Sequence, residues 1–294
     1  MPKNIRIIPR LDIKGPNLVK GIHLEGLRVL GKPEQFSRYY YEAGADELIY
    51  MDVVASLYNR NSLHEIIERT AREIYIPLTV GGGLRTIDDM CAVLRVGADK
   101  VSLNTAAVKN PEIIRQAARK FGSSTVVISI EAIKQPDGLY MVYTDNGREH
   151  TGLEVNAWAK EVEGLGAGEI LLTSVDREGT GQGYDIELTK MVSEAVSIPV
   201  IACGGAGECE DIKEVIISGK ADAVCVSSML HYDIIKHQAF KGALYEDEGN
   251  IEYLKSGRVF TKIKTVALTD IKLYLLEQGI VCRQFKKSEL AHAG

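Results

Sequence analysis

The stretch PLTVGGGLRTIDDMCAVLRVGADKVSLNTA, residues 77–106, decides the fold. It begins with a short apolar run and three glycines, continues with apolar residues at helical spacing, and ends in a second apolar run before Asn104 and Thr105. Nearly the same order recurs in PVIACGGAGECEDIKEVIISGKADAVCVSSM, residues 199–229. A short apolar strand followed by an amphipathic helix is typical of the βα units that build parallel sheets.

Short runs rich in Ile, Val and Leu, each followed by a segment of helical period, occur eight times along the chain. Strands are predicted at residues 5–11, 47–52, 78–80, 100–103, 125–131, 169–173, 200–203 and 223–226. Helices are predicted at residues 33–43, 62–74, 86–96, 111–121, 154–165, 185–196 and 208–218. Eight alternations in 294 residues favour one α/β domain, residues 1–294, folded as a (β/α)8 TIM barrel.

The two halves of the chain are related to each other. A displacement of 122 residues, from Pro77 to Pro199, also lays Gly82 and Gly83 on Gly204 and Gly205. After one inserted residue, Asn104 and Thr105 fall on Ser227 and Ser228. The barrel is therefore predicted to consist of two homologous half-barrels of four βα units each.

Composition narrows the classes of function. The chain is 45% hydrophobic and 26% charged, with a formal net charge of −5, which is typical of a globular protein and gives no electrostatic basis for binding nucleic acid. No apolar run approaches the roughly 18–20 residues of a membrane span, and the N-terminus lacks a signal-peptide core, so a cytoplasmic location is expected. Five cysteines are expected to be reduced core thiols, and the close pair Cys203 and Cys209 lacks zinc spacing, so neither a metal site nor a cofactor is expected.

Glycine turns follow a strand in both halves, at residues 81–83 and 204–207. Active sites of barrels lie at the carboxyl ends of the strands, and glycine lets backbone N–H groups approach a ligand closely. The next strand in each half ends in Asn104-Thr105 or Ser227-Ser228 before a helix, a pattern that suits phosphate. The sequence predicts two facing anion sites and a ligand with a phosphate at each end, whereas tight turns alone are the alternative interpretation.

Alternation within the strands assigns side chains to the barrel interior. Arg6, Ile8, Arg10 and Asp12 share the inward face of the first strand, and Glu131 lies on the inward face of the fifth. Asp12 and Glu131 are predicted to face each other at the mouth as a pair suited to general acid and base catalysis. For a single carboxylate, a helix cap or salt-bridge partner is the alternative role.

Four charged residues open strands at the other end of the barrel, with the parity of inward residues: Arg6, Glu47, Lys100 and Glu169. Two cations and two anions are predicted to neutralise one another as a ring on the barrel floor. The residues alone leave two interpretations open, a structural seal and a gate on a passage through the barrel.

These residues lie in motifs that resemble the cyclase subunit of imidazole glycerol phosphate synthase, a family of histidine biosynthesis. The resemblance covers residues 6–231 and resumes at 270–283 in DIKLYLLEQGIVCR. Its motifs are LDIK and LVKG within residues 11–21, TVGGG at 79–83, GADKVSLNTAAV at 97–108, GAGEILLTSVDREGTGQGYD at 166–185, GGAG at 204–207 and ADAVCVSSMLH at 221–231. Together these motifs are very specific.

The resemblance implies a reaction, a partner and a set of site residues. A glutaminase subunit docked at the floor, forming a heterodimer, delivers ammonia through the barrel to a bis-phosphorylated phosphoribulosyl-formimino aminoimidazole carboxamide ribonucleotide, which is converted to imidazole glycerol phosphate and aminoimidazole carboxamide ribonucleotide. The implied catalytic pair is Asp12 and Glu131, and the ring at the floor is the implied ammonia gate. Implied substrate and phosphate ligands are Gly83, Asn104 and Thr105 at one end, Gly179, Gly205, Ser227 and Ser228 at the other, and Lys20, on the first loop, with Thr173 and Glu178.

The chain departs from the family pattern at four places. Glu131 and Glu178 stand where the family has aspartates, Arg10 replaces a small inward residue, and the segment at about 238–270 before the last helix is extended. One added methylene moves a carboxylate by roughly an ångström, a shift to which catalysis is sensitive. Two alternatives to the histidine-pathway cyclase therefore stay open: a paralogue that aminates or amidinates a nucleotide- or phospho-sugar for surface polysaccharide, and a non-catalytic barrel that activates a glutaminase.

Overall fold

The computed structural model describes residues 4–54, 63–237 and 262–283. Its centre is a closed barrel of eight parallel strands, in the order β1, β4, β5, β6, β7, β10, β11 and β12, with β12 pairing back to β1. The barrel strands are β1 (Arg6–Lys14), β4 (Leu48–Asp52), β5 (Leu78–Gly81), β6 (Lys100–Leu103), β7 (Val126–Lys134), β10 (Glu169–Ser174), β11 (Val200–Cys203) and β12 (Ala223–Val226). The predicted (β/α)8 barrel is confirmed.

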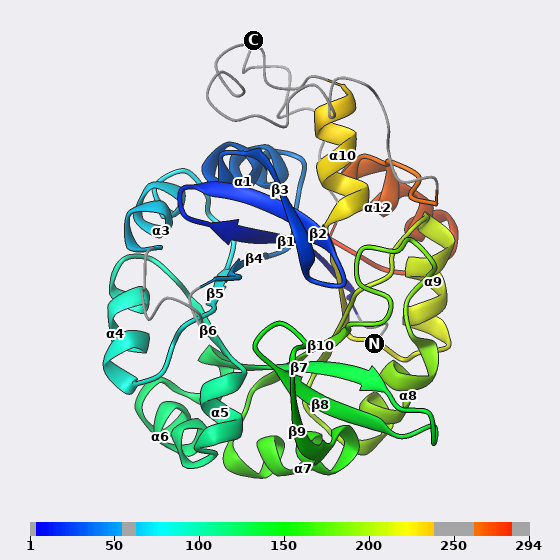
Figure 1. Cartoon of the computed structure of the whole chain (residues 1–294). Coiled ribbons are helices and arrows are strands. Elements are labelled where there is room, and N and C mark those ends of the chain that lie inside the picture. The colour runs from blue at the N-terminus through cyan, green and yellow to red at the C-terminus, as the bar shows by residue number, and fades with distance from the viewer. Residues whose placement is uncertain (1–3, 55–62, 238–261, 284–294) are drawn as a thin grey trace.

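Helices form a ring outside the barrel, as Figure 1 shows along the barrel axis. They are α1 (Pro33–Glu42), α3 (His64–Ala71), α4 (Ile87–Arg95), α5 (Thr105–Lys109), α6 (Glu112–Phe121), η1 (Ser123–Thr125), α7 (Val155–Leu165), α8 (Ile186–Ala195), α9 (Cys209–Ile217), α10 (Ser228–Lys236) and α12 (Leu268–Glu277). None of the helices in the described ranges combines the length and apolar character that a membrane span needs.

Two hairpins that the sequence did not predict lie at the mouth of the barrel, on opposite sides of it (Figure 1). They follow β1 and β7, the first strand of each half, and consist of β2 (Asn17–Ile22) with β3 (Glu25–Gly31) and β8 (Tyr140–Thr144) with β9 (Glu149–Glu154). Lys20, expected on a loop, lies in β2. Both hairpins extend the preceding barrel strand by antiparallel pairing. Their equivalent positions agree with the predicted two-half organisation.

Apolar side chains pack in two layers. The larger cluster lies between the strands and the helices, where Phe36, Tyr40 and Trp158 are almost fully buried. The smaller cluster fills the barrel interior with side chains that include Ile8, Ile49, Val127, Leu171 and Ile201. The interior layer lies between the floor of the barrel and its mouth.

The expected extension at about 238–270 lies mostly outside the described residues, which resume at 262. Beyond it, α12 packs against the barrel, and Lys272 on this helix donates to the Gly44 carbonyl at 2.6 Å and forms an ion pair with Asp46 at 2.8 Å. A bridge between Ile5 and Cys282 joins the end of the described chain to the start of β1.

Candidate active site

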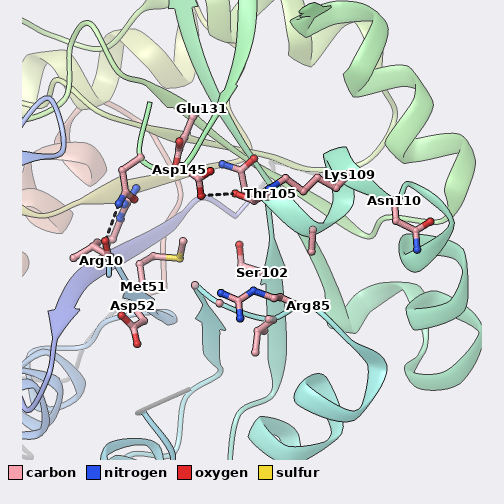
Figure 2. Close-up of a pocket in the computed structure, with 17 residues that line it drawn as sticks. Arg10, Met51, Asp52, Arg85, Ser102, Thr105, Lys109, Asn110, Glu131 and Asp145 are labelled. Atoms are coloured by element: carbon pink, nitrogen blue, oxygen red, sulfur yellow. Dashed lines mark hydrogen bonds between the residues drawn. The ribbon is translucent and has the colours of Figure 1, made fainter. Parts of the chain in front are cut away.

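A cavity of about 370 Å³ opens at the carboxyl ends of the barrel strands on the side of the N-terminal half. Figure 2 shows the side chains that surround it. Its lining comprises Arg10, Met51, Asp52, Val53, Gly82, Gly83, Leu84, Arg85, Ser102, Asn104, Thr105, Ala106, Lys109, Asn110, Glu131, Asp145 and Asn146. The cavity lies where ligands bind in barrels of this class.

The first predicted phosphate site forms one wall of this cavity. Gly82 has a φ of +92°, and a Cβ at this position would lie 2.2 Å from the Asp52 carbonyl oxygen. The turn therefore requires glycine. Asn104 precedes α5, and the Thr105 hydroxyl lies 3.4 Å from an Asp145 carboxylate oxygen. Gly83, Asn104 and Thr105 thus come together as predicted from the sequence.

Two basic side chains beside this wall were not predicted as site residues. Arg85 follows the glycine turn and Lys109 ends α5, and both line the cavity. They add positive charge next to Gly83 and Thr105, which suits a phosphate group. Their positions two residues after Gly83 and four after Thr105 were the available signal in the sequence.

The second predicted phosphate site is nearly filled. Gly179, Gly205, Ser227 and Ser228 line a cavity of about 20 Å³ together with Lys20, Glu178 and both Cys203 and Cys225. The Lys20 ammonium forms an ion pair with Glu178 inside this space, and both residues are buried. The His23 N–H also donates to the Glu178 carbonyl at 2.9 Å, so the β2–β3 hairpin lies against this site.

Glu131 is a buried carboxyl group that reaches the larger cavity. It is 6% exposed, and its Oε2 accepts a hydrogen bond from the Gly147 N–H at 2.8 Å. Burial raises the pKa of the Glu131 carboxyl to about 7, against the effects of the Gly147 hydrogen bond, the Arg10 charge and a hydrogen bond with Asn104, while Asp145 adds to the rise. A group with this pKa exchanges protons readily near neutral pH.

Asp12 has a different environment. Arg10 Nε donates to its Oδ1 at 2.8 Å, and the Lys20 ammonium lies 3.7 Å from its Oδ2. Burial opposes ionisation, but the charges of Arg10 and Lys20 outweigh it, so the pKa of Asp12 lies below its ordinary value. Asp12 is 2% exposed and lines neither of the two cavities. Of the two carboxyl groups, Glu131 therefore lines the larger cavity and Asp12 does not.

Thr173 and His231 support the centre of the site. Thr173 is fully buried on β10, in register with Glu131, and lies 3.4 Å from Arg10 Nη1. His231 lies on α10, 2.6 Å from the Tyr40 hydroxyl and 3.0 Å from the Arg10 carbonyl. Burial lowers the pKa of His231 to about 3, so the ring is neutral. His231 therefore links α10 to α1 and β1, and it does not line the larger cavity.

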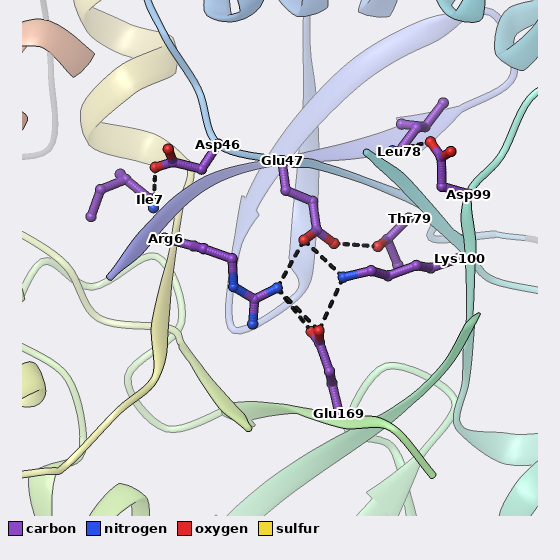
Figure 3. A network of polar contacts seen from close by, with 9 residues as sticks. All are labelled: Arg6, Ile7, Asp46, Glu47, Leu78, Thr79, Asp99, Lys100 and Glu169. Atoms are coloured by element: carbon purple, nitrogen blue, oxygen red, sulfur yellow. Dashed lines mark hydrogen bonds and ion pairs between the residues drawn. The ribbon is translucent and has the colours of Figure 1, made fainter. Parts of the chain in front are cut away.

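The four charges predicted at the floor form a closed ring, shown in Figure 3. Arg6 Nη1 lies 2.9 Å from Glu47 and 3.1 Å from Glu169, and Lys100 Nζ lies 2.9 Å and 3.0 Å from the same two carboxylates. The Thr79 hydroxyl donates to Glu47 at 2.6 Å. Each cation thus contacts both anions at the amino-terminal end of the barrel.

Comparison with known proteins places the chain in a class and then in a family. The fold and the cavity at the strand ends are those of a (β/α)8-barrel enzyme. A family model described as histidine biosynthesis protein matches residues 6–236. The chain is similar to proteins named imidazole glycerol phosphate synthase subunit HisF. That of Legionella pneumophila is 62% identical over 208 residues, which are 71% of this chain and 98% of that protein.

Two further relatives with the same name cover more of the chain. That of Alkaliphilus metalliredigens (strain QYMF) is 48% identical over 241 residues, 82% of this chain and 96% of the relative. That of Nostoc sp. (strain PCC 7120 / SAG 25.82 / UTEX 2576) is 45% identical over 246 residues, 83% of this chain and 95% of the relative. The chain belongs to the HisF family of imidazole glycerol phosphate synthase subunits, which are enzymes of histidine biosynthesis. The relatives support this activity over the sugar-modifying and non-catalytic alternatives.

Proposed function

We propose that this chain is the ammonia-using cyclase of an imidazole glycerol phosphate synthase. Its substrate is the bis-phosphorylated phosphoribulosyl-formimino aminoimidazole carboxamide ribonucleotide, and its products are imidazole glycerol phosphate and aminoimidazole carboxamide ribonucleotide. The observation that carries the proposal is the cavity of about 370 Å³, which joins a glycine turn and two basic side chains to a buried carboxyl group.

One phosphate of the substrate binds at Gly83, Asn104 and Thr105, where Arg85 and Lys109 supply positive charge. The other binds at Gly179, Gly205, Ser227 and Ser228. Lys20, now paired with Glu178, turns to this second phosphate when the substrate enters. Glu131 transfers protons in the middle, because its pKa of about 7 lets it accept and return a proton near neutral pH.

The partner in this proposal is a glutaminase subunit that docks at the floor of the barrel and forms a heterodimer with it. The relatives are each named as a subunit, and the ring of Arg6, Glu47, Lys100 and Glu169 stands at the end of the barrel opposite the cavity. The ring serves as the gate through which ammonia enters the barrel. We further infer that residues 1–294 form one domain and that the protein is cytoplasmic, which its five free thiols support.

Two measurements test the proposal. The purified chain is expected to convert the named substrate with ammonium chloride as nitrogen donor, and to restore growth of a histidine auxotroph when co-expressed with its glutaminase. A well-folded protein that fails both tests would contradict the proposal. Turnover of an amino-sugar precursor in the same assay would favour the sugar-modifying alternative, whereas stimulation of a glutaminase without any turnover would favour the scaffold.

A further inference from the structure

Two cysteines lie side by side inside the mouth of the barrel. Cys203 ends β11 and Cys225 lies on β12, and the two residues are direct partners in the parallel ladder between these strands. Both side chains belong to the apolar cluster inside the barrel, so they lie on the same face of the sheet. Neighbouring strands are about 4.7–4.9 Å apart, which falls within the range of about 4.4–6.8 Å that a disulfide spans between Cα atoms. The backbone therefore has the spacing of a disulfide, and both cysteines are free thiols.

The surroundings distinguish the two sulfurs. The Cys225 thiol donates a hydrogen bond to Cys203, and Arg10 Nη1 donates to the Cys203 Sγ at 3.4 Å. The hydrogen bond from Cys225 and the charge of Arg10 lower the pKa of the Cys203 thiol below its ordinary value, against the effects of burial and of the Glu178 charge. Burial raises the pKa of the Cys225 thiol well above its ordinary value. Because oxidants react with thiolates, Cys203 is the reactive sulfur and Cys225 is a neutral thiol beside it.

Both sulfurs are reached from the second predicted phosphate site, because both cysteines line its cavity of about 20 Å³. Such a volume holds roughly one water molecule, which is also room for the reacting oxygen of hydrogen peroxide. Each cysteine also precedes a predicted phosphate ligand by two residues, Gly205 after Cys203 and Ser227 after Cys225. A covalent change at the two sulfurs therefore acts on the backbone that forms this site.

We propose that Cys203 and Cys225 form an oxidation site, at which a peroxide converts the two thiols to a disulfide that weakens the second phosphate site. The Cys203 thiolate attacks one oxygen of hydrogen peroxide, the O–O bond breaks, and the leaving hydroxide takes up the proton that Cys203 had lost. The Cys225 sulfur then attacks the sulfur of the resulting Cys203 sulfenic acid. The S–O bond breaks, and the hydroxyl group leaves as water with the Cys225 proton. One peroxide is thus reduced to two waters, and the two thiols are oxidised by two electrons.

The disulfide affects phosphate binding because the site has to open. Its cavity of about 20 Å³ is smaller than a phosphate group, so the glycine turn after β11 and the start of α10 must separate when the substrate binds. A covalent link between β11 and β12, just before these two segments, restricts that opening. This effect on the substrate rests on the proposed function, whereas formation of the disulfide does not.

Mass spectrometry of the full chain tests the oxidation site. The reduced protein is treated with a slight excess of hydrogen peroxide, alkylated with iodoacetamide in urea and digested. We expect a cross-linked peptide pair that contains Cys203 and Cys225, two hydrogen atoms lighter than the separate thiols, which dithiothreitol separates again. In Cys225→Ser the cross-link should be absent, and dimedone should trap a sulfenic acid at Cys203. The partly exposed Cys91 is the internal control and should still be alkylated.

Turnover measures the effect on the phosphate site, with the bis-phosphorylated substrate and ammonium chloride. The oxidised wild type should have a KM about 3- to 10-fold higher than the reduced protein, as for the loss of one hydrogen bond to the substrate, and dithiothreitol should restore it. Cys203→Ser lacks the reactive sulfur, so its KM should be the same before and after peroxide. Circular dichroism checks folding, and Cys225→Ala replaces Cys225→Ser if the serine variant does not fold.

Three results would overturn the inference. These are oxidation of Cys91 before Cys203, a disulfide between other cysteines in place of the expected one, and a KM that stays the same once the Cys203–Cys225 disulfide has formed. Absence of turnover by the reduced wild type would instead refute the proposed function, and the cross-linking result would stand apart from it.

Discussion

Glu47 is the most buried member of the ring at the barrel floor, and its replacement by glutamine tests the ring most directly. Glu47 is 1% exposed and accepts hydrogen bonds from Arg6, Lys100 and Thr79. Glutamine has the same shape but no charge, so Glu47→Gln leaves two cations facing one carboxylate, Glu169. The variant therefore removes charge from the ring without opening a cavity.

The expected cost follows from burial. Removing one partner of a fully buried ion pair costs about 3–5 kcal/mol. The Arg6 and Lys100 side chains are 26% and 14% exposed and both keep Glu169, so water and the second carboxylate reduce the penalty. We expect Glu47→Gln to lower the free energy of unfolding by about 2 kcal/mol. For a chain of 294 residues that corresponds to a fall in Tm of about 3 °C.

Urea unfolding followed by circular dichroism measures this change, with Glu68→Gln as the matched control. Glu68 forms an exposed i,i+4 pair with Arg72 at 2.6 Å, and its loss should cost less than about 0.5 kcal/mol. Equal losses in the two variants would refute the reasoning, because the ring would then contribute no more than a surface pair.

Activity of the same variant separates a gate from a seal. If the ring passes ammonia, Glu47→Gln changes the glutamine-dependent turnover of the complex and leaves turnover with added ammonium near the wild-type value. If both turnovers change in parallel with stability, the ring is a structural seal. The comparison requires only the two nitrogen donors and the intact complex.

Two further predictions concern the cavity. Gly82→Ala should lower the free energy of unfolding by at least about 2 kcal/mol, because the added Cβ would lie 2.2 Å from the Asp52 carbonyl oxygen. Gly138→Ala is the control: its φ is also positive, at +90°, but no atom lies within 4 Å of the added Cβ, so it should cost only about 1 kcal/mol of backbone strain. Urea unfolding compares the two, and equal costs would show that the turn adapts. Burial raises the pKa of Glu131 from 4.5 to about 7. The unfolded chain therefore loses this proton at a lower pH than the folded chain does. As a result, the free energy of unfolding falls by on the order of 3 kcal/mol as pH rises from about 4.5 to 7. Glu131→Gln lacks this loss, so its stability relative to the wild type should increase between pH 5 and pH 8, and a constant difference would contradict the pKa.

The alternation of strands and helices could be predicted from the sequence because each barrel strand carries its own apolar run. The predicted bounds at 100–103, 200–203 and 223–226 agree with β6, β11 and β12 residue for residue. The β2–β3 and β8–β9 hairpins were missed, because the second strand of each hairpin, β3 or β9, mixes exposed and partly buried residues without a clear alternation. Local sequence pattern was thus sufficient to predict the barrel and insufficient to predict the hairpins at its mouth.

Sequence alone also determined which residues gather at each end, since strand parity places Arg6, Arg10, Asp12 and Glu131 inside the barrel. It did not determine how these side chains pair. Only the tertiary structure decided that Arg10 pairs with Asp12 and that Lys20 pairs with Glu178, 158 residues away, in the second phosphate site. Parity fixes the face of a strand on which a side chain lies, whereas its contacts depend on the charges that other strands bring to the same buried space. The physical reason is that buried charges must be paired, and the partner is chosen in three dimensions.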